Sequence, residues 1–316
     1  MLRKLFGKGK ESNGPAAQRD GVQKLSLSLS SQILGAIGGA HSIPAMPALA
    51  QKAFQLALNP DALAQDFVDV ILADEAMAAR VLKIANSVYF DRGTPTETVE
   101  QAVHIIGTNE LRSLLNATTL SDLFPSRDPV RELLWVHNIG TALIAREIAK
   151  RHLSGKESLA FLGGLMHDIG KLLLLQRLAE NYTKIIEQVG DKATTFWEVE
   201  EAEFPFDHTQ VGQLIAERWR FSEELTEVIR YHHDPLSSVD PNNLGLHHVV
   251  GCADRIAHAL GIGHPKGFTG FQSKQLEELS EVWRVLNVAE SAHKQELDNL
   301  QKLFTTEYDL YANEGS

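Results

Sequence analysis

The sequence predicts an all-α protein, and two observations carry that prediction. From Ile43 to Phe124 apolar residues recur at three- and four-residue spacing, which is the period of one helix face and not of a strand. A second block with the same spacing runs from Arg131 to about Leu260, and the first block holds no convincing alternating run. No period of about twenty to fifty residues repeats, so the helices are not expected to form a solenoid.

Short breaks divide the first half of the chain. Residues 1–21 are basic, polar and rich in glycine, and we expect a flexible arm there. Residues 22–39 can form a short leading helix. Asn59-Pro60-Asp61 predicts a turn before a new helix, and Thr98-Val99-Glu100-Gln101 has the pattern of a capping box. The segment Pro125–Pro129 then separates the two helical blocks.

The second half is also expected to be helical. Its predicted helices cover about 133–149, 159–175, 208–219, 223–233 and 245–260. Residues 275–316 are acidic and amphipathic, which predicts one helix around Leu276–Leu286 and a second through Leu297–Phe304. We expect these two helices to form a C-terminal cap; the alternative is a partner-binding helix.

The composition is that of an ordinary globular protein. Hydrophobic residues make up 43% and charged residues 22%, so a substantial core can be buried. The formal net charge of −11 argues against a protein-wide nucleic-acid surface, which would need a basic stripe. Cys252 is the single cysteine, so a metal site would have to use histidine and carboxylate ligands. The N-terminus lacks a signal-peptide pattern and no apolar run reaches the length of a membrane span, which predicts a cytoplasmic location.

Histidine is the most informative residue type in this chain. There are 13 histidines, and several lie in expected helices beside a carboxylate or a second histidine. Taken singly, such a histidine is more often a hydrogen-bonded core residue than a ligand. A divalent ion needs several nitrogen and oxygen donors from different helices, and separate segments of this chain offer them. The candidate metal ligands are His137, His167, Asp168, His208, His232, His233 and Asp254.

The pair His167-Asp168 and the nearby Lys171 form one motif. Neighbouring residues on a helix point about 100° apart, so His167 and Asp168 can share one ion only at the edge between them, or else bridge two ions. Lys171 lies one turn beyond Asp168 on the same face. A charged lysine cannot be a ligand, but it can neutralise a phosphate. The alternative for Lys171 is a charge on the helix surface.

The order His137, His167-Asp168 and Asp254 along the chain resembles the metal-binding signature of the HD phosphohydrolase superfamily. His208 and His232-His233 are similar to the second-metal histidines of its HD-GYP branch, which hydrolyses cyclic dinucleotides, and HDIGK is also a form found in that branch. The closer resemblance, over residues 40–260, is to the HDOD family, an HD-related output domain of bacterial signalling proteins. It rests on IPAMPALAQK, ILADEAMAARVLKIANSVYF, TVEQAVHIIGTNELRSLL, LWVHNIGTALIAREIA, FLGGLMHDIGKLLL, FDHTQVGQLIAERW and IRYHHDP.

The HDOD resemblance implies how the chain is organised. It implies an all-α fold in which an N-terminal helical subdomain packs on an HD-like helical bundle. The predicted segments are a flexible basic arm, the N-terminal subdomain, the HD-like subdomain and a C-terminal helical extension, over residues 1–21, 22–130, 131–262 and 263–316.

The same resemblance implies a signal-transduction adaptor that binds a signalling partner. The alternative is a metal-dependent phosphohydrolase acting on a cyclic nucleotide or other phosphodiester. Against the enzyme, the GYP extension is absent after His233, and Leu133 stands where trinuclear relatives carry a glutamate. HDOD proteins have commonly lost ligands, whereas this chain keeps the whole set.

An intact site would follow two-metal logic. One ion would be held by His137, His167, Asp168 and Asp254, and a second by His208, His232 and His233, with Asp168 bridging. Such ligands suit iron, manganese or zinc better than magnesium or calcium. In an enzyme, Asp168 and Lys171 would be the catalytic residues, with Lys171 stabilising charge on the phosphoryl oxygens.

Other conspicuous residues have structural interpretations. We expect Asn86 to end a helix by hydrogen bonding, and Cys252 to be a packed core thiol. His247, His248 and His258 lie near Asp254 but have no counterpart in the family pattern, so they stand outside the predicted site.

Overall fold

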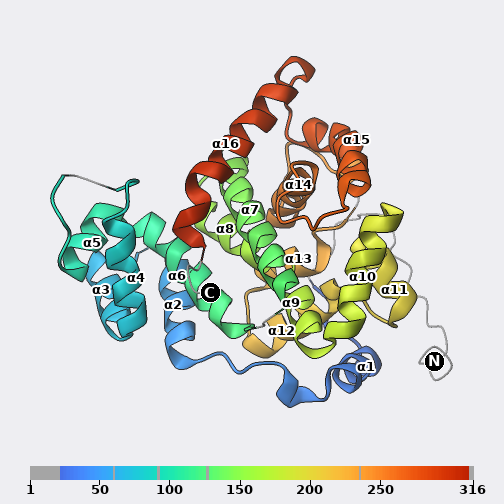
Figure 1. The fold of residues 1–316 in the computed structure, drawn as a ribbon, viewed down its shortest axis with the longest axis horizontal. Helices are drawn as coiled ribbons and strands as arrows, with labels where there is room; N and C mark the ends of the chain where they lie inside the picture. Colours follow the sequence, from blue (N-terminus) through green and yellow to red (C-terminus); the bar gives the residue numbers. More distant parts are fainter. Residues whose placement is uncertain (1–21, 60, 91–92, 126–127, 235, 313–316) are drawn as a thin grey trace. The chain divides into compact units, whose positions relative to one another are not determined.

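The computed structural model describes residues 22–59, 61–90, 93–125, 128–234 and 236–312. These residues form α-helices and short 3-10 helices, and no strand occurs among them (Figure 1). The all-α prediction is therefore confirmed. The predicted arm over residues 1–21 lies outside the described residues.

The chain divides into two compact units. Unit 1 comprises residues 1–44 and 124–306, and unit 2 comprises residues 45–123 and 307–316. The four segments expected from the sequence stay a prediction.

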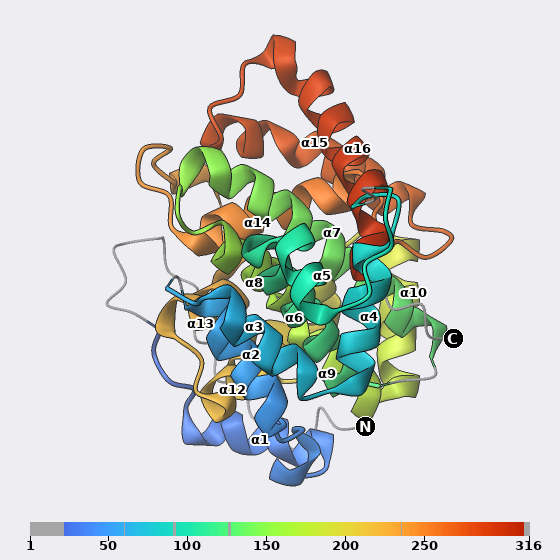
Figure 2. The same cartoon turned by 90° about the vertical axis from the view of Figure 1, so that its left-hand side faces the viewer.

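Unit 2 is a small helical bundle. Its helices are α2 (Ala48–Leu58), α3 (Ala64–Leu72), α4 (Glu75–Ala85), α5 (Val99–Ile106) and α6 (Thr108–Leu123). α5 packs on both α3 and α4, as Figure 2 shows. The predicted capping box is present, because Thr98 accepts a hydrogen bond from the backbone N–H of Gln101. Asn86 ends α4, and its amide also bonds the backbone of Thr96 in both directions, as a helix-ending residue should.

Unit 1 contains α7 (Pro129–His152), the longest helix among the described residues. Its helices are α1 (Leu27–Ile37), α7 (Pro129–His152), α8 (Glu157–Met166), α9 (Ile169–Arg177), α10 (Ala179–Lys192), α11 (Phe196–Glu203), α12 (His208–Trp219), α13 (Glu223–Tyr231), α14 (Leu246–Ala259), α15 (Thr269–Val285) and α16 (His293–Tyr311), whose end belongs to unit 2. Short 3-10 helices cover Ala40–Ser42, Leu236–Ser238 and Glu290–Ala292. α8 and α14 both pack against α7, so three helices meet in the centre of the unit (Figure 1).

Glycine lets α7 and α8 approach closely. A Cβ on Gly164 would lie 2.4 Å from the Cα of Ala142 in α7, a distance that no side chain tolerates. The approach is reinforced where the side chain of Asn138 donates to the carbonyl of Leu165. α8 therefore delivers His167 to the middle of α7.

The predicted helix over 159–175 is wrong in one respect, because the segment forms two helices. α8 ends at Met166 and α9 begins at Ile169, so His167 and Asp168 lie at the break. The whole segment Glu157–Arg177 is long and apolar enough to cross a membrane, contrary to the expectation from the sequence. Its most apolar window is nevertheless 89% buried inside the structure, as a core helix would be. Because His167 and Asp168 lie at the break between α8 and α9, the 100° argument for adjacent residues on one helix does not apply to them.

The two C-terminal helices occur as expected, as α15 and α16. α15 packs on α14 and buries Phe271, Val282 and Trp283. Cys252 is fully buried in the same core, as predicted.

Candidate metal centre

The structure brings all seven predicted ligands together inside unit 1. They form two groups, in each of which one ligand atom from every residue lies within 4.8 Å of the others. Group A consists of His137, His167 and Asp254, and group B of Asp168, His208, His232 and His233. Only His233 has an appreciably exposed side chain, at 24%.

Ligands enter the site mostly from helix ends. His137 and Asp254 stand within α7 and α14, whereas His167 ends α8 and His232 ends α13. His208 is the first residue of α12, and its position follows from the cap before it. Asp207 accepts hydrogen bonds from the backbone N–H groups of Thr209 and Gln210, which starts the helix at His208.

Asp168 lies between the two groups. Its Oδ1 is 3.3 Å from His208 Nε2 and 3.7 Å from His232 Nε2, both in group B. Its Oδ2 is 3.3 Å from His167 Nε2, in group A. One carboxylate oxygen therefore faces each group, which is the arrangement of a bridging ligand.

Backbone carbonyls outside the cluster orient three of the histidine rings. His137 Nδ1 lies 3.3 Å from the carbonyl oxygen of Ile262, and His167 Nδ1 lies 2.7 Å from that of Gly164. His232 Nδ1 lies 3.2 Å from the carbonyl of Ile229. A carbonyl only accepts, so in neutral His167 and His232 Nδ1 carries the proton and Nε2 presents a lone pair to the cluster. His137 Nε2 lies 3.0 Å from Asp254 Oδ1, so this ring has an acceptor at both nitrogens. Metal-binding histidines are normally oriented by such outer partners.

Three atoms of the cluster that could ligate a metal have no hydrogen-bond partner. They are His167 Nε2, Asp168 Oδ1 and His232 Nε2, and all are buried. An unpaired buried polar atom costs about 1–3 kcal/mol, and an ion bound between these three would satisfy them. The donor set, imidazole with carboxylate, fits a divalent transition metal.

The charges of the cluster also favour a cation. Burial opposes ionisation of Asp168, but His167 and Lys171 outweigh it and hold its pKa well below the usual range. Burial likewise opposes charging of His167, yet the two neighbouring carboxylates raise its pKa to about 10. Burial lowers the pKa of His232 to about 4, so this ring is neutral and able to act as a ligand. Without an ion, a proton on His167 supplies part of the positive charge that the carboxylates require.

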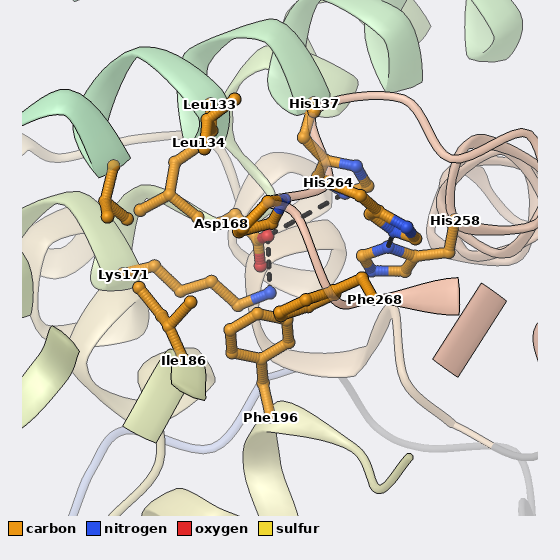
Figure 3. Close-up of a pocket in the computed structure, with 13 residues that line it drawn as sticks. Leu133, Leu134, His137, Asp168, Lys171, Ile186, Phe196, His258, His264 and Phe268 are labelled. Atoms are coloured by element: carbon orange, nitrogen blue, oxygen red, sulfur yellow. Dashed lines mark hydrogen bonds and ion pairs between the residues drawn. The ribbon is translucent and has the colours of Figure 1, made fainter. Parts of the chain in front are cut away.

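Lys171 is not a surface charge. Its side chain is 1% exposed, and Nζ donates to Asp168 Oδ2 at 2.6 Å. Nζ lies 4.1 Å from the centroid of the Phe196 ring. Figure 3 shows the two side chains beside each other. In this arrangement the ammonium neutralises Asp168.

Arg255 holds the backbone that carries two of the ligands. Its guanidinium donates to the carbonyl oxygens of His232, His233 and Asp234 at 3.1, 3.4 and 3.0 Å. α13 and α14 also touch here, since a Cβ on Gly251 would lie 2.4 Å from the carbonyl oxygen of His232. These contacts fix the ends of α13 against α14.

Sequence reasoning missed two histidines beside the ligands. His258 Nε2 lies 3.3 Å from Asp254 Oδ1, and its ring stacks on His137 with centroids 4.2 Å apart. His258 Nδ1 in turn lies 2.9 Å from His264 Nε2. The spacing of four residues between Asp254 and His258 was a usable signal, because it places both on one helix face. His264 lies in the loop after α14, where no periodicity indicates its direction.

These two histidines line a small apolar cavity next to Lys171 (Figure 3). The cavity measures about 20 Å³, which is room for about one water molecule. Phe196 and Phe268 are among its walls. His247 and His248, also set aside in the sequence analysis, lie in neither ligand group.

The family model of the HDOD domain matches residues 43–235. An uncharacterised protein of Treponema pallidum is 25% identical over 216 residues, which are 67% of this chain. Those residues are only 41% of the Treponema protein, so this chain spans less than half the length of its curated relative.

Solved structures share the fold. An HDOD domain protein of unknown function from Geobacter sulfurreducens superposes with a TM-score of 0.72 at 24% identity, covering 90% of this chain and 99% of that one. A candidate signal transduction protein from Marinobacter aquaeolei gives 0.71 at 20% identity, over 90% and 66% of the two chains. A candidate phosphohydrolase from Shewanella amazonensis gives 0.66 at 21% identity, over 89% and 98%.

Proposed function

Because this chain belongs to the HDOD domain family, we propose that it is a signal-transduction output module whose buried His/Asp pocket binds a divalent transition metal. The observation that carries the proposal is the set of unpaired donors at His167 Nε2, Asp168 Oδ1 and His232 Nε2. Buried polar atoms are normally satisfied, and a bound cation would satisfy all three of these atoms at once.

The two ligand groups would hold two ions, with Asp168 shared between them. Group A would hold one ion with the help of Asp168 Oδ2, and group B the other through Asp168 Oδ1. Five imidazoles and two carboxylates suit iron, manganese or zinc and disfavour magnesium and calcium.

A signalling role agrees with the family and with one structural neighbour. The Marinobacter aquaeolei protein is a candidate signal transduction protein, and this chain shares its fold. In this role a signalling protein is the partner, the location is cytoplasmic, and the metal has a structural or ligand-sensing use.

A metal-dependent phosphohydrolase is the second candidate function. It is favoured by the bridging position of Asp168 and by a buried lysine beside it, as well as by the Shewanella amazonensis neighbour. Two divalent ions in the pocket would supply Lewis-acid chemistry for hydrolysis of a phosphodiester. Lys171 would then turn its ammonium from Asp168 to the phosphoryl oxygens. The cavity beside Lys171 has no room for a nucleotide, whereas group B reaches the surface at His233.

Elemental analysis of the protein purified without a histidine tag tests metal binding. We expect close to two ions in the natural protein, nearly none in Asp168→Ala, and one in His208→Ala. His248→Ala is the matched control, since His248 lies outside both groups and its replacement should leave the metal content unchanged. Metal-free natural protein, or unchanged metal content in Asp168→Ala, would sink the proposal.

A hydrolysis assay separates the two candidate functions. The substrates are cyclic dinucleotides and simple phosphodiesters, with Mn²⁺ or Fe²⁺ added. Product that disappears in Asp168→Ala supports the enzyme. No product from protein that demonstrably holds its ions supports the binding module.

A further inference from the structure

A fully buried carboxylate, Glu200, lies behind the metal pocket and is not one of the ligands. Three donors converge on it. His208 Nδ1 lies 2.6 Å from Oε2, and the backbone N–H of His208 donates to the same oxygen at 2.8 Å. The hydroxyl of Tyr182 donates to Oε1 at 2.5 Å. Glu200, His208 and Tyr182 are each 0% exposed.

This contact distinguishes His208 from the other inward-facing ligands. His137, His167 and His232 are oriented by neutral backbone carbonyls. His208 is oriented by a carboxylate, and a carboxylate makes the opposite nitrogen a stronger donor to a metal. Group B, which contains His208, is therefore electrostatically different from group A.

The burial of Glu200 needs a positive charge near it. A buried carboxylate is costly unless it is paired with a positive charge. Among the described residues, Glu200 is paired with His208. An ion on the far nitrogen of His208 would balance the charge of Glu200 through the ring.

α11 is built to present this carboxylate. Its first turn carries a capping box between Thr195 and Glu198, which fixes where the helix begins. Phe196 and Glu200 are four residues apart and so share one face. Phe196 lies beside Lys171, as Figure 3 shows, while Glu200 reaches His208 one turn further on. One face of α11 therefore supports both Lys171 and His208 from behind.

We propose that Glu200 is a positioning residue that holds His208 with Nε2 toward the pocket and selectively strengthens the ion of group B. The inference rests on the proposed metal binding, and it adds that the two ions are held unequally and that Glu200 causes part of the difference. Glu200 touches no ion and acts through the imidazole of His208.

Glu200→Gln tests the role of the charge. Glutamine has the same length and can still accept both hydrogen bonds from His208, but it is neutral. We expect the ion of group B to bind about 10- to 100-fold more weakly, and the ion of group A to bind as before. Zinc affinities from competition with a chromophoric chelator, together with stoichiometry by elemental analysis, measure both. Glu201→Gln is the matched control, because Glu201 is the next residue and is exposed.

Glu200→Asp separates charge from shape. Aspartate keeps the charge but is one methylene shorter, so it should hold the ion of group B more tightly than glutamine does. A merely structural contact would give the reverse order, since glutamine fills the space better. Nitrogen NMR of the metal-free protein adds a readout independent of binding: His208 should carry its proton on Nδ1 in the natural protein and populate both tautomers in Glu200→Gln.

The outcomes separate the two proposals. If the natural protein binds no metal, the proposed function fails and this inference fails with it. If the natural protein binds two ions and Glu200→Gln binds both with unchanged affinity, the role of Glu200 alone is overturned. Equal weakening of both ions would also overturn it. If Glu200→Gln does not fold, folded Glu200→Asp provides the test. A loss of affinity for the ion of group B that is smaller than tenfold supports the role of Glu200, and complete loss of that ion refutes it.

Discussion

Replacing Lys171 with methionine should destabilise the metal-free protein far more than the metal-loaded protein. The ammonium of Lys171 is buried and pairs with Asp168 at 2.6 Å. Methionine has nearly the same length and keeps the contacts with the apolar wall around Phe196. The substitution therefore removes a charge with little change in packing.

The expected magnitude follows from the burial of the pair. Removing one partner of a buried ion pair costs about 3–5 kcal/mol, because the other charge stays buried without compensation. In Lys171→Met that charge is Asp168, whose side chain is 1% exposed. The proton of His167 compensates it in part, so we expect a loss of about 3 kcal/mol in the metal-free protein. A bound ion neutralises Asp168 instead, so the loss should fall to about 1–2 kcal/mol in the loaded protein, the usual cost of a substitution without a buried unpaired charge.

The same reasoning makes a prediction about affinity. By thermodynamic linkage, a substitution that destabilises the free form by about 2 kcal/mol more than the bound form tightens binding by the same amount, or about thirtyfold. Lysine and the ion compete for Asp168, so Lys171→Met should bind metal more tightly than the natural protein.

Urea unfolding measured with a chelator and with saturating metal gives the two free energies of unfolding. Lys184→Met is the control, because Lys184 lies on α10 with an exposed side chain and should change the free energy by less than about 0.5 kcal/mol. Equal destabilisation with and without metal would refute the reasoning. So would weaker metal binding by Lys171→Met.

Two further predictions concern packing and thiol chemistry. Gly170→Ala should unfold more easily by about 1–3 kcal/mol in thermal or urea unfolding, because its Cβ would lie 1.9 Å from the carbonyl oxygen of His208 and α9 would have to move from α12. Gly35→Ala is the counterpart in the open interior of α1 and should be neutral or stabilising by about 0.5–1 kcal/mol; equal losses in the two variants would contradict the packing argument. Burial raises the pKa of Cys252 to about 12, so at pH 8 the native thiol is almost wholly protonated and should not react with a disulfide reagent until the protein is unfolded in urea. Rapid reaction of the native protein would show that Cys252 is not packed as described.

Much of the candidate site could be predicted because its signals are local or ordered along the chain. His137, His208 and Asp254 each lie in a predicted helix, and helices follow from spacing within the sequence. The order of the ligand residues then indicated a shared pocket. Whether a residue is buried could not be predicted in this way, because burial depends on which elements pack together.

Lys171 illustrates what spacing cannot show. Its position one turn after Asp168 was evident, and the sequence allowed either a surface charge or a charge in the pocket. Only the packing of α9 against α7, α10 and α12 buries it and turns it toward Asp168. In the sequence, Glu200 is one of several acidic residues in the segment that forms α11. Only its contact with His208 of α12 shows that it supports that residue.

The sequence by itself determined that the protein is helical, that its metal-capable donors are histidines and carboxylates, and that they belong to an HDOD pattern. These properties reside in residue type, period and order, which the chain carries before it folds. The tertiary structure decided that the helical segment 157–177 breaks at His167 and Asp168, and that Asp168 faces both groups. It also decided that carbonyls orient the rings of His137, His167 and His232, and that Glu200 orients the ring of His208. Those properties depend on distances between segments far apart in the sequence, and such distances exist only once the helices have packed.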